Sequence, residues 1–150
     1  MIRFVIACLL VAMASTVATR TNAEDRYGKQ KVVYHINYNG GEDDKAYRAA
    51  MRNIQNHINA VGKDNIEVKV VLHGNGVNLL KDAVNNQKVQ QDVLSLRSQQ
   101  VKFQVCNNTL KGRKLSYEND LFEVFKDDIV PSGVAELSRL QQMGYTYIKP

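Results

Sequence analysis

The apolar positions of this chain change period several times after residue 23. β-Branched and aromatic residues crowd residues 31–38, 66–72 and 101–106, which is the composition of β-strands. Between the first two runs, apolar residues recur at helical spacing until Gly62, and Glu42, Asp43 and Asp44 stand where the helix dipole favours negative charge. The pattern predicts a strand, a helix and a second strand in this order.

Two further helices are predicted before the third strand, and the signal weakens after it. Their apolar positions are Val77, Leu80 and Val84, then Val89, Val93 and Leu96. Residues 115–126 predict a short helix with irregular chain, residues 129–130 a short strand, and residues 145–148 a last strand. A helix between these two strands would bury Val134, Leu137, Leu140 and Met143. Strands alternating with helices predict one α/β domain, with a mainly parallel five-stranded sheet covered on both faces.

The N-terminal segment has the pattern of a secretory signal. Arg3 precedes an uncharged apolar run that ends at Ala18, and small residues precede Glu24. The run is short for a membrane span. We expect residues 1–23 to be cleaved, leaving a periplasmic or secreted domain at residues 24–150 without membrane attachment. The alternative is an uncleaved anchor.

The charge pattern argues against a nucleic-acid partner. The formal net charge is +5, and residues 1–23 contribute only Arg3 and Arg20 to it. Lys111, Arg113 and Lys114 form the one tight basic cluster, without interleaved aromatic residues. We interpret this cluster as a solvated loop rather than an anion site.

The sequence also lacks the usual spacings of metal and nucleotide sites. No Cys-x-x-Cys or His-x-x-x-His pair occurs, and Gly74 and Gly76 lack the third glycine of a dinucleotide fingerprint. His35 lies in a predicted buried strand as a core histidine, and His57 falls on the polar side of the first helix. We therefore expect neither a metal nor a cofactor.

Cys106 is the candidate for chemistry. Cleavage of residues 1–23 would remove Cys8, so no intramolecular disulfide could form. The remaining thiol is then buried and inert, paired between chains, or reactive. It ends the third strand, and a helical turn after it would direct backbone N–H groups at the sulfur and lower its pKa.

Ligands of parallel sheets gather outside the carboxyl ends of the strands, where the strand order reverses. Four polar turns are expected there: Asn39 and Gly40; His73, Gly74, Asn75 and Gly76; Cys106, Asn107 and Asn108; and Ser132 and Gly133. His73 either holds Cys106 as a thiolate through a hydrogen bond or caps local backbone groups. Ser132 is best explained as a helix cap.

Several spaced motifs together resemble the DsrE/DsrF-like family. They are YNGG at 38–41, HGNGVNLL at 73–80, VCNNTL at 105–110, VPSGV at 130–134 and GYTYIKP at 144–150. The resemblance implies a flavodoxin-like three-layer α/β/α domain, assembly as trimers or hexamers, and transfer of sulfur as a cysteine persulfide. It makes Cys106 the sulfur-carrying residue and implies separate proteins as sulfur donor and acceptor.

Two other functions stay open beside a sulfur carrier or sulfurtransferase. One is a non-catalytic oligomeric module of the same fold that binds a small ligand or acts as a scaffold. The other is a structural oligomer in which Cys106 is a core thiol. Assembly is also expected from an apolar segment of Leu121, Phe122, Val124, Phe125 and Ile129, which we interpret as an interface patch.

Overall fold

The computed structural model describes residues 26–150. The predicted signal peptide at residues 1–23, including Cys8, lies outside the described residues. Within them, five parallel strands form one sheet in the order β4-β3-β2-β1-β5. The strands are β1 (Gln30–Ile36), β2 (Ile66–Leu72), β3 (Lys102–Cys106), β4 (Ile129–Val130) and β5 (Thr146–Ile148). The prediction of a parallel five-stranded sheet is confirmed.

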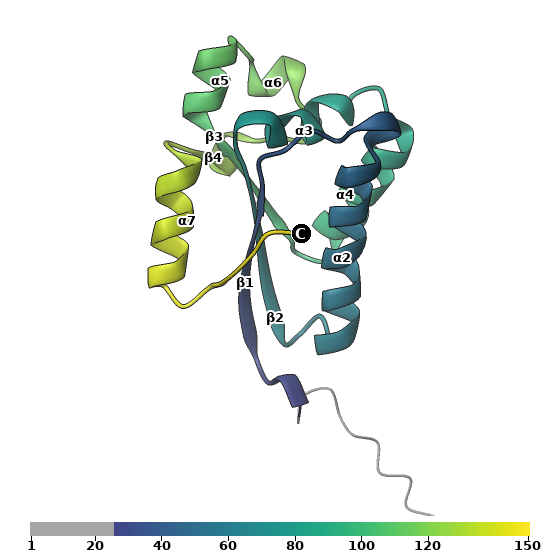
Figure 1. Cartoon of the computed structure of the whole chain (residues 1–150), viewed down its shortest axis with the longest axis vertical. Helices are drawn as coiled ribbons and strands as arrows, with labels where there is room; N and C mark the ends of the chain where they lie inside the picture. Colours follow the sequence, from purple (N-terminus) through teal and green to yellow (C-terminus); the bar gives the residue numbers. More distant parts are fainter. Residues whose placement is uncertain (1–25) are drawn as a thin grey trace, which may run out of the picture.

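Helices cover both faces of this sheet (Figure 1). Helices α2 (Lys45–Val61) and α4 (Gln87–Ser98) pack side by side on one face, which we call the α2/α4 face. Helix α7 (Gly133–Gln142) packs on β1, β2 and β3 from the other side, the α7 face. The predicted three-layer α/β/α arrangement is confirmed.

Shorter helices complete the connections. Helices α3 (Asn78–Asp82), α5 (Asn107–Arg113) and α6 (Tyr117–Asp120) lie near the carboxyl ends of the strands (Figure 1). Single 3₁₀ turns occupy η1 (Glu42–Asp44), η2 (Gly74–Val77) and η3 (Lys126–Asp128). None of the helices within residues 26–150 combines the length and apolar character needed to cross a membrane.

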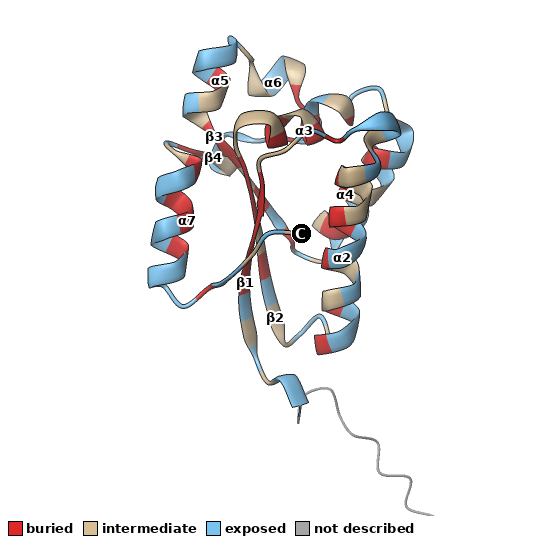
Figure 2. Ribbon diagram, in the orientation of Figure 1, coloured by how far each residue is buried: buried red, intermediate tan, exposed pale blue. Residues whose placement is uncertain are grey.

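The core is divided unequally by the sheet (Figure 2). Alternate residues of each strand point to opposite faces. Val32, Tyr34 and Ile36 of β1 join a large apolar cluster on the α2/α4 face. The α7 face holds a small cluster, formed by Val33, Val71, Leu137, Leu140 and Tyr145.

The first strand ends earlier than predicted, at Ile36 rather than at residue 38. Turn η2 packs directly on the end of β1, where a Cβ atom on Gly76 would lie 1.9 Å from the carbonyl oxygen of Ile36. Gly76 is therefore needed for a close backbone approach.

The acidic residues before α2 do not form its first turn. Asp43 and Asp44 have positive φ angles of 50° and 53°, so the helix begins only at Lys45. Short polar side chains tolerate this left-handed conformation, and the Asp44 carboxylate accepts a 2.8 Å hydrogen bond from Asn86. The negative charges lie ahead of the helix rather than inside it.

Three residues predicted to be buried are exposed. Val84 lies beyond the end of α3, while Val134 and Met143 lie outside the buried stripe of α7, which contains Leu137 and Leu140. The apolar spacing predicted the buried residues in the middle of α7 correctly, but the buried stripe does not extend to the apolar residues at either end.

The Lys111, Arg113 and Lys114 cluster is solvated as interpreted, but it lies at the end of a helix rather than in a loop. Lys111 and Arg113 lie in the last turn of α5, and Lys114 follows as its C-cap with a left-handed φ of 55°. Basic residues are stabilised there by the helix dipole. The Arg113 guanidinium also donates hydrogen bonds to the side chains of Asn75 and Asn78.

The predicted apolar interface patch is mostly core. Leu121 and Val124 are buried in the large cluster, and Phe122 and Ile129 pack half-buried against it. Only Phe125 is exposed, at 58%. Buried residues of an irregular segment carry no periodicity, so the sequence did not distinguish core from surface here.

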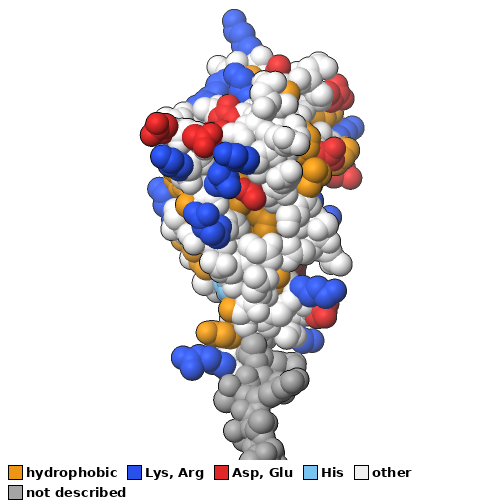
Figure 3. All heavy atoms as spheres, turned by 90° about the vertical axis from the view of Figure 1, so that its right-hand side faces the viewer, with side chains coloured by type: hydrophobic (Ala, Val, Ile, Leu, Met, Phe, Trp, Pro, Cys, Tyr) orange, Lys and Arg blue, Asp and Glu red, His pale blue; other side chains and the backbone are white. Residues whose placement is uncertain are grey.

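Figure 3 shows the molecule from the side of α2 and α4. Basic and acidic side chains are interspersed on this face, and apolar side chains occur in small groups. Pairs such as Arg48 with Asp92 and Lys88 with Asp43 contribute to this mixture.

Candidate functional site

The strand register places three polar residues in one row across the sheet. Leu72 pairs with Ile36 on one side and with Val105 on the other. The next residues of the three strand ends are Asn37, His73 and Cys106. Side chains alternate along strands, so this row points to the α7 face.

Cys106 ends β3 and directly precedes α5. It is buried, with 5% of its surface exposed, and is the free cysteine of the described residues. The sequence left this thiol buried and inert, paired between chains, or reactive, and in the structure α5 and the first turn of α7 enclose it.

Hydrogen-bond donors converge on the Cys106 sulfur. Burial by itself raises the pKa of the thiol. The N–H group of Gly133 acts in the opposite direction, together with the hydroxyl and N–H of Thr109 and the N–H of Asn108. Since these donors outweigh burial, the pKa of Cys106 falls below its ordinary value.

Thr109 is a site residue that the sequence analysis missed. Its hydroxyl oxygen accepts a 2.9 Å hydrogen bond from the N–H of Gly74. This bond occupies the oxygen as an acceptor and leaves the hydroxyl proton for the Cys106 sulfur. The position of Thr109, three residues after the cysteine and in the first turn of a helix, was the available signal.

Gly133 separates Cys106 from His73. A Cβ atom on Gly133 would lie 2.9 Å from Cβ of His73 and 3.3 Å from Cβ of Cys106. Only glycine lets the first turn of α7 approach both residues this closely. Ser132 caps the same turn, accepting a 3.4 Å hydrogen bond from the N–H of Ala135, as predicted.

His73 is bonded to a histidine rather than to the thiol. Its Nε2 lies 2.7 Å from Nε2 of His35, and the two rings stack with centroids 4.7 Å apart. Nδ1 of His35 lies 2.7 Å from the hydroxyl of Tyr147. The hypothesis of a His73–Cys106 hydrogen bond is not met within residues 26–150. His35 is buried as predicted, but its partners make it part of the site.

Both histidines are held neutral. Burial lowers the pKa of His35 to about 4, with further lowering by His73 and by the Lys149 ammonium group. Burial and Lys149 also lower the pKa of His73. Near neutral pH each ring therefore has one protonated and one unprotonated nitrogen.

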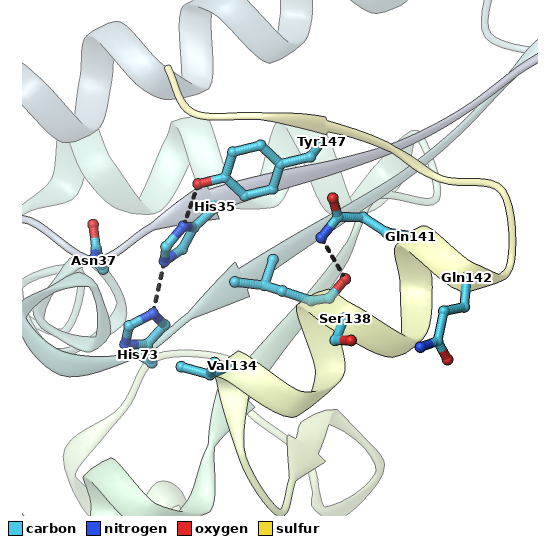
Figure 4. Close-up of a pocket in the computed structure, with 9 residues that line it drawn as sticks. His35, Asn37, His73, Val134, Ser138, Gln141, Gln142 and Tyr147 are labelled. Carbon is cyan, nitrogen blue, oxygen red and sulfur yellow. Dashed lines mark hydrogen bonds between the residues drawn. The ribbon is translucent and has the colours of Figure 1, made fainter.

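A cavity of about 760 Å³ opens beside the histidines (Figure 4). It lies between the end of β1, strand β5 and helix α7. Strands β2 and β5 flank β1 on opposite sides, so the cavity occupies the predicted reversal of strand order. Its wall includes His35, Asn37, His73, Tyr147, Ser138, Gln141 and Gln142, with Val134 and Leu137 as apolar members.

The other predicted residues have mainly structural contacts. Gly40 packs on the Tyr47 ring, and Asn39 beside it is exposed. The Asn75 carbonyl accepts a 2.7 Å hydrogen bond from the Tyr47 hydroxyl, and its side chain binds Arg113. Asn107 is half-buried, and Asn108 contributes its backbone N–H to Cys106 while its side chain is exposed.

His57 is far from this arrangement in the fold. It bonds the Tyr34 hydroxyl at 2.9 Å and the Gln30 side chain at 2.8 Å, on the α2/α4 face. Its contacts make it half-buried rather than a free polar side chain. Residues 26–150 contain no group of three or more His, Cys, Asp or Glu side chains suited to a metal ion.

Comparison with known proteins gives a family and a fold. Residues 31–150 match the model of the DsrE/DsrF-like family. A solved structure of a protein of unknown function, MTH1491 from Methanobacterium thermoautotrophicum, is similar with a TM-score of 0.66 and 30% identity. The similarity covers 81% of this chain and 100% of that one. No curated protein matches the chain.

Proposed function

This chain belongs to the DsrE/DsrF-like family, and from that premise we propose that it carries sulfur as a persulfide on Cys106. The observation that carries the proposal is the place of the sulfur at the start of α5, against the first turn of α7, where the N–H groups of Gly133, Thr109 and Asn108 lower its pKa. A core thiol without a role in chemistry needs no such donors, because free cysteine packs as a small hydrophobic residue.

The same donors suit each stage of sulfur transfer. A thiolate is the nucleophilic form of cysteine, and the N–H groups of Gly133 and Thr109 stabilise its negative charge. The thiolate attacks the terminal sulfur of a donor, whose sulfur–sulfur bond breaks. The resulting persulfide is also acidic, so the donors stabilise its anion until an acceptor takes the outer sulfur.

The setting of this reaction is part of the proposal. An exported chain would carry sulfur in the periplasm or outside the cell, between donor and acceptor proteins. Assembly as a trimer or hexamer is carried over from the family resemblance. Phe125 is the one exposed member of the apolar segment first considered, so that segment gives little support to assembly.

A non-catalytic binding module is the second candidate. The cavity beside His35 and His73 favours it, because about 760 Å³ suits a small organic ligand and no cysteine lines the wall. On this alternative, the ligand would bind to wild-type and Cys106→Ser protein with the same affinity.

Intact mass spectrometry distinguishes the two candidates. Reduced protein, with Cys8→Ser where residues 1–23 are retained, is incubated with inorganic polysulfide. We expect the mass of one or more sulfur atoms to be added to Cys106, and none in Cys106→Ser. Wild-type protein that gains no sulfur while a known carrier is loaded would contradict the proposal.

A further inference from the structure

We infer that Tyr147, His35 and His73 form a proton relay between solvent and the sulfur chemistry at Cys106. His73 is the group of the relay nearest the thiol, and His35 and Tyr147 are positioning residues that act through it. The inference rests on the proposed function, since it concerns how sulfur reaches Cys106.

The hydrogen bonds form a continuous chain from the surface inward (Figure 4). Tyr147 is 40% exposed, so its hydroxyl group can exchange protons with water. His35 is 8% exposed and bonds Tyr147 through one ring nitrogen and His73 through the other, both at 2.7 Å. A buried ring bonded at both nitrogens is in the position that proton transfer through an imidazole requires.

The inner end of the chain is open. Nδ1 of His73 has no hydrogen-bond partner among residues 26–150, whereas its Nε2 is bonded to His35. His73 follows β2 and Cys106 ends the neighbouring strand β3, with the Gly133 backbone against both β-carbons. The free nitrogen thus belongs to the residue adjacent to Cys106 in the row at the strand ends.

Because both rings are neutral, we expect protons to pass by exchange between tautomers, without a histidine that holds a positive charge. Lys149 is the charged group that acts on both histidines, and its ammonium group disfavours a second cation beside it. Each ring then receives a proton at one nitrogen while it releases one from the other, and neither becomes an imidazolium.

The relay is needed when the leaving group is a basic thiolate, as with an organic persulfide R–S–SH. The Cys106 thiolate forms a bond to the outer sulfur, the sulfur–sulfur bond of the donor breaks, and R–S⁻ leaves with the electron pair. The Cys106 sulfur is oxidised and the inner donor sulfur is reduced, so no other redox agent takes part.

Proton transfer completes the step. R–S⁻ takes the proton from Nδ1 of His73, whose Nε2 takes one from Nε2 of His35. Nδ1 of His35 takes the Tyr147 proton, and water restores it, leaving hydroxide. Cys106 carries S–SH, and the donor has become R–SH.

Two sulfur donors separate the relay from the carrier function. Glutathione persulfide leaves a basic thiolate, which needs a proton. Inorganic polysulfide leaves a shorter polysulfide anion, which is weakly basic and needs none. We expect His35→Gln to slow loading of Cys106 by glutathione persulfide about a hundredfold, the lower end of the usual contribution of acid–base assistance, and to slow loading by polysulfide much less.

Tyr147→Phe tests the solvent end of the relay, where a water molecule can replace the tyrosine hydroxyl group. We expect a smaller slowing, of a few fold, with glutathione persulfide alone. The matched control is His57→Gln, because His57 also bonds a tyrosine hydroxyl group but belongs to the α2/α4 face. It should leave both rates unchanged.

Wild-type loading by the persulfide should be slower in D₂O, and His35→Gln should lose most of this isotope effect.

The outcomes are separable. Equal rates of persulfide loading for wild-type and His35→Gln protein would overturn the relay, as would equal slowing with both donors, which marks a structural defect. If wild-type protein accepts sulfur from neither donor, the carrier function itself fails. If polysulfide loads wild-type protein and persulfide loading is insensitive to the relay variants, only the relay fails.

Discussion

The two faces of the sheet differ in how they use the same strands. On the α2/α4 face, all the side chains that β1, β2 and β3 carry, except Gln30, join or pack against one apolar cluster that includes Tyr34, Val70 and Phe103. On the α7 face, the alternate positions of these strands include His35, Lys69 and Gln104. One face therefore supplies most of the hydrophobic stabilisation, and the other can hold polar groups.

Several polar groups of the α7 face pair with one another, although the buried carbonyl oxygen of Gln104 has no hydrogen-bond partner within residues 26–150. Gln104 donates a 2.9 Å hydrogen bond to the buried Glu136 carboxylate, which also binds Arg139 at 2.6 Å. Arg139 and Gln104 hold the pKa of Glu136 below its usual value. The two faces thus show how stability on one side permits polar and reactive groups on the other.

The largest expected effect concerns neighbouring residues of β3. Phe103 is fully buried on the α2/α4 face, so Phe103→Ala should lower the free energy of unfolding by roughly 3–5 kcal/mol. Gln104→Ala, on the α7 face, removes one hydrogen bond to a carboxylate and should cost about 1.5–3 kcal/mol. Urea unfolding measures both. Similar losses from the two variants would remove the distinction between the faces.

Acid should destabilise the α7 face through His35. The pKa of His35 is about 4 in the folded protein, below the ordinary value of 6.5, so the unfolded chain binds the proton first as the pH falls. Stability is then retained above pH 6.5 and lost between about pH 6.5 and 4, by at most about 3 kcal/mol from this group.

The comparison of wild-type and His35→Gln protein isolates this contribution. His73 and His57 also have lowered pKa values and act in the same direction. Unfolding by urea at pH 7 and pH 4.5 should show a smaller acid loss in the variant. An equal loss in both proteins would show that His35 is not held neutral by the fold.

Gly133→Ala should disturb the site at a moderate cost. Its Cβ would press on β-carbons of His73 and Cys106, and overpacking of this kind costs roughly 1–3 kcal/mol. Gly112→Ala is the matched control, because no atom lies within 4 Å of the added Cβ in helix α5. Alanine there should stabilise the protein by up to about 1 kcal/mol. Thermal unfolding should show shifts of opposite sign.

The smallest change expected is local to the thiol. Thr109→Val removes the hydroxyl donor, so the pKa of Cys106 should rise. The pH dependence of alkylation by iodoacetamide reports this shift. Thr109→Ser keeps the hydroxyl group and should keep the wild-type midpoint. A Thr109→Val midpoint equal to that of the wild type would exclude the hydroxyl group as a significant donor.

Local patterns predicted the strands and the place of Cys106 well. The run before Cys106 is apolar and β-branched, and polar residues follow it, so both the strand and its end are visible in sequence. The contact between His35 and His73 was not predicted, because it depends on the register of β1 against β2 and on the rotation of two rings. The role of Gly133 depends likewise on how α7 packs.

The most direct test of a reactive Cys106 is the pH dependence of its alkylation in the native wild-type protein. The converging N–H groups predict a midpoint below the ordinary thiol pKa of roughly 8.5. Labelling should proceed without denaturant and should be absent in Cys106→Ser, with Cys8→Ser in both proteins where residues 1–23 are retained. A midpoint at or above the ordinary value, or a thiol that reacts only after unfolding, would contradict a sulfur-carrying role for the α7 face.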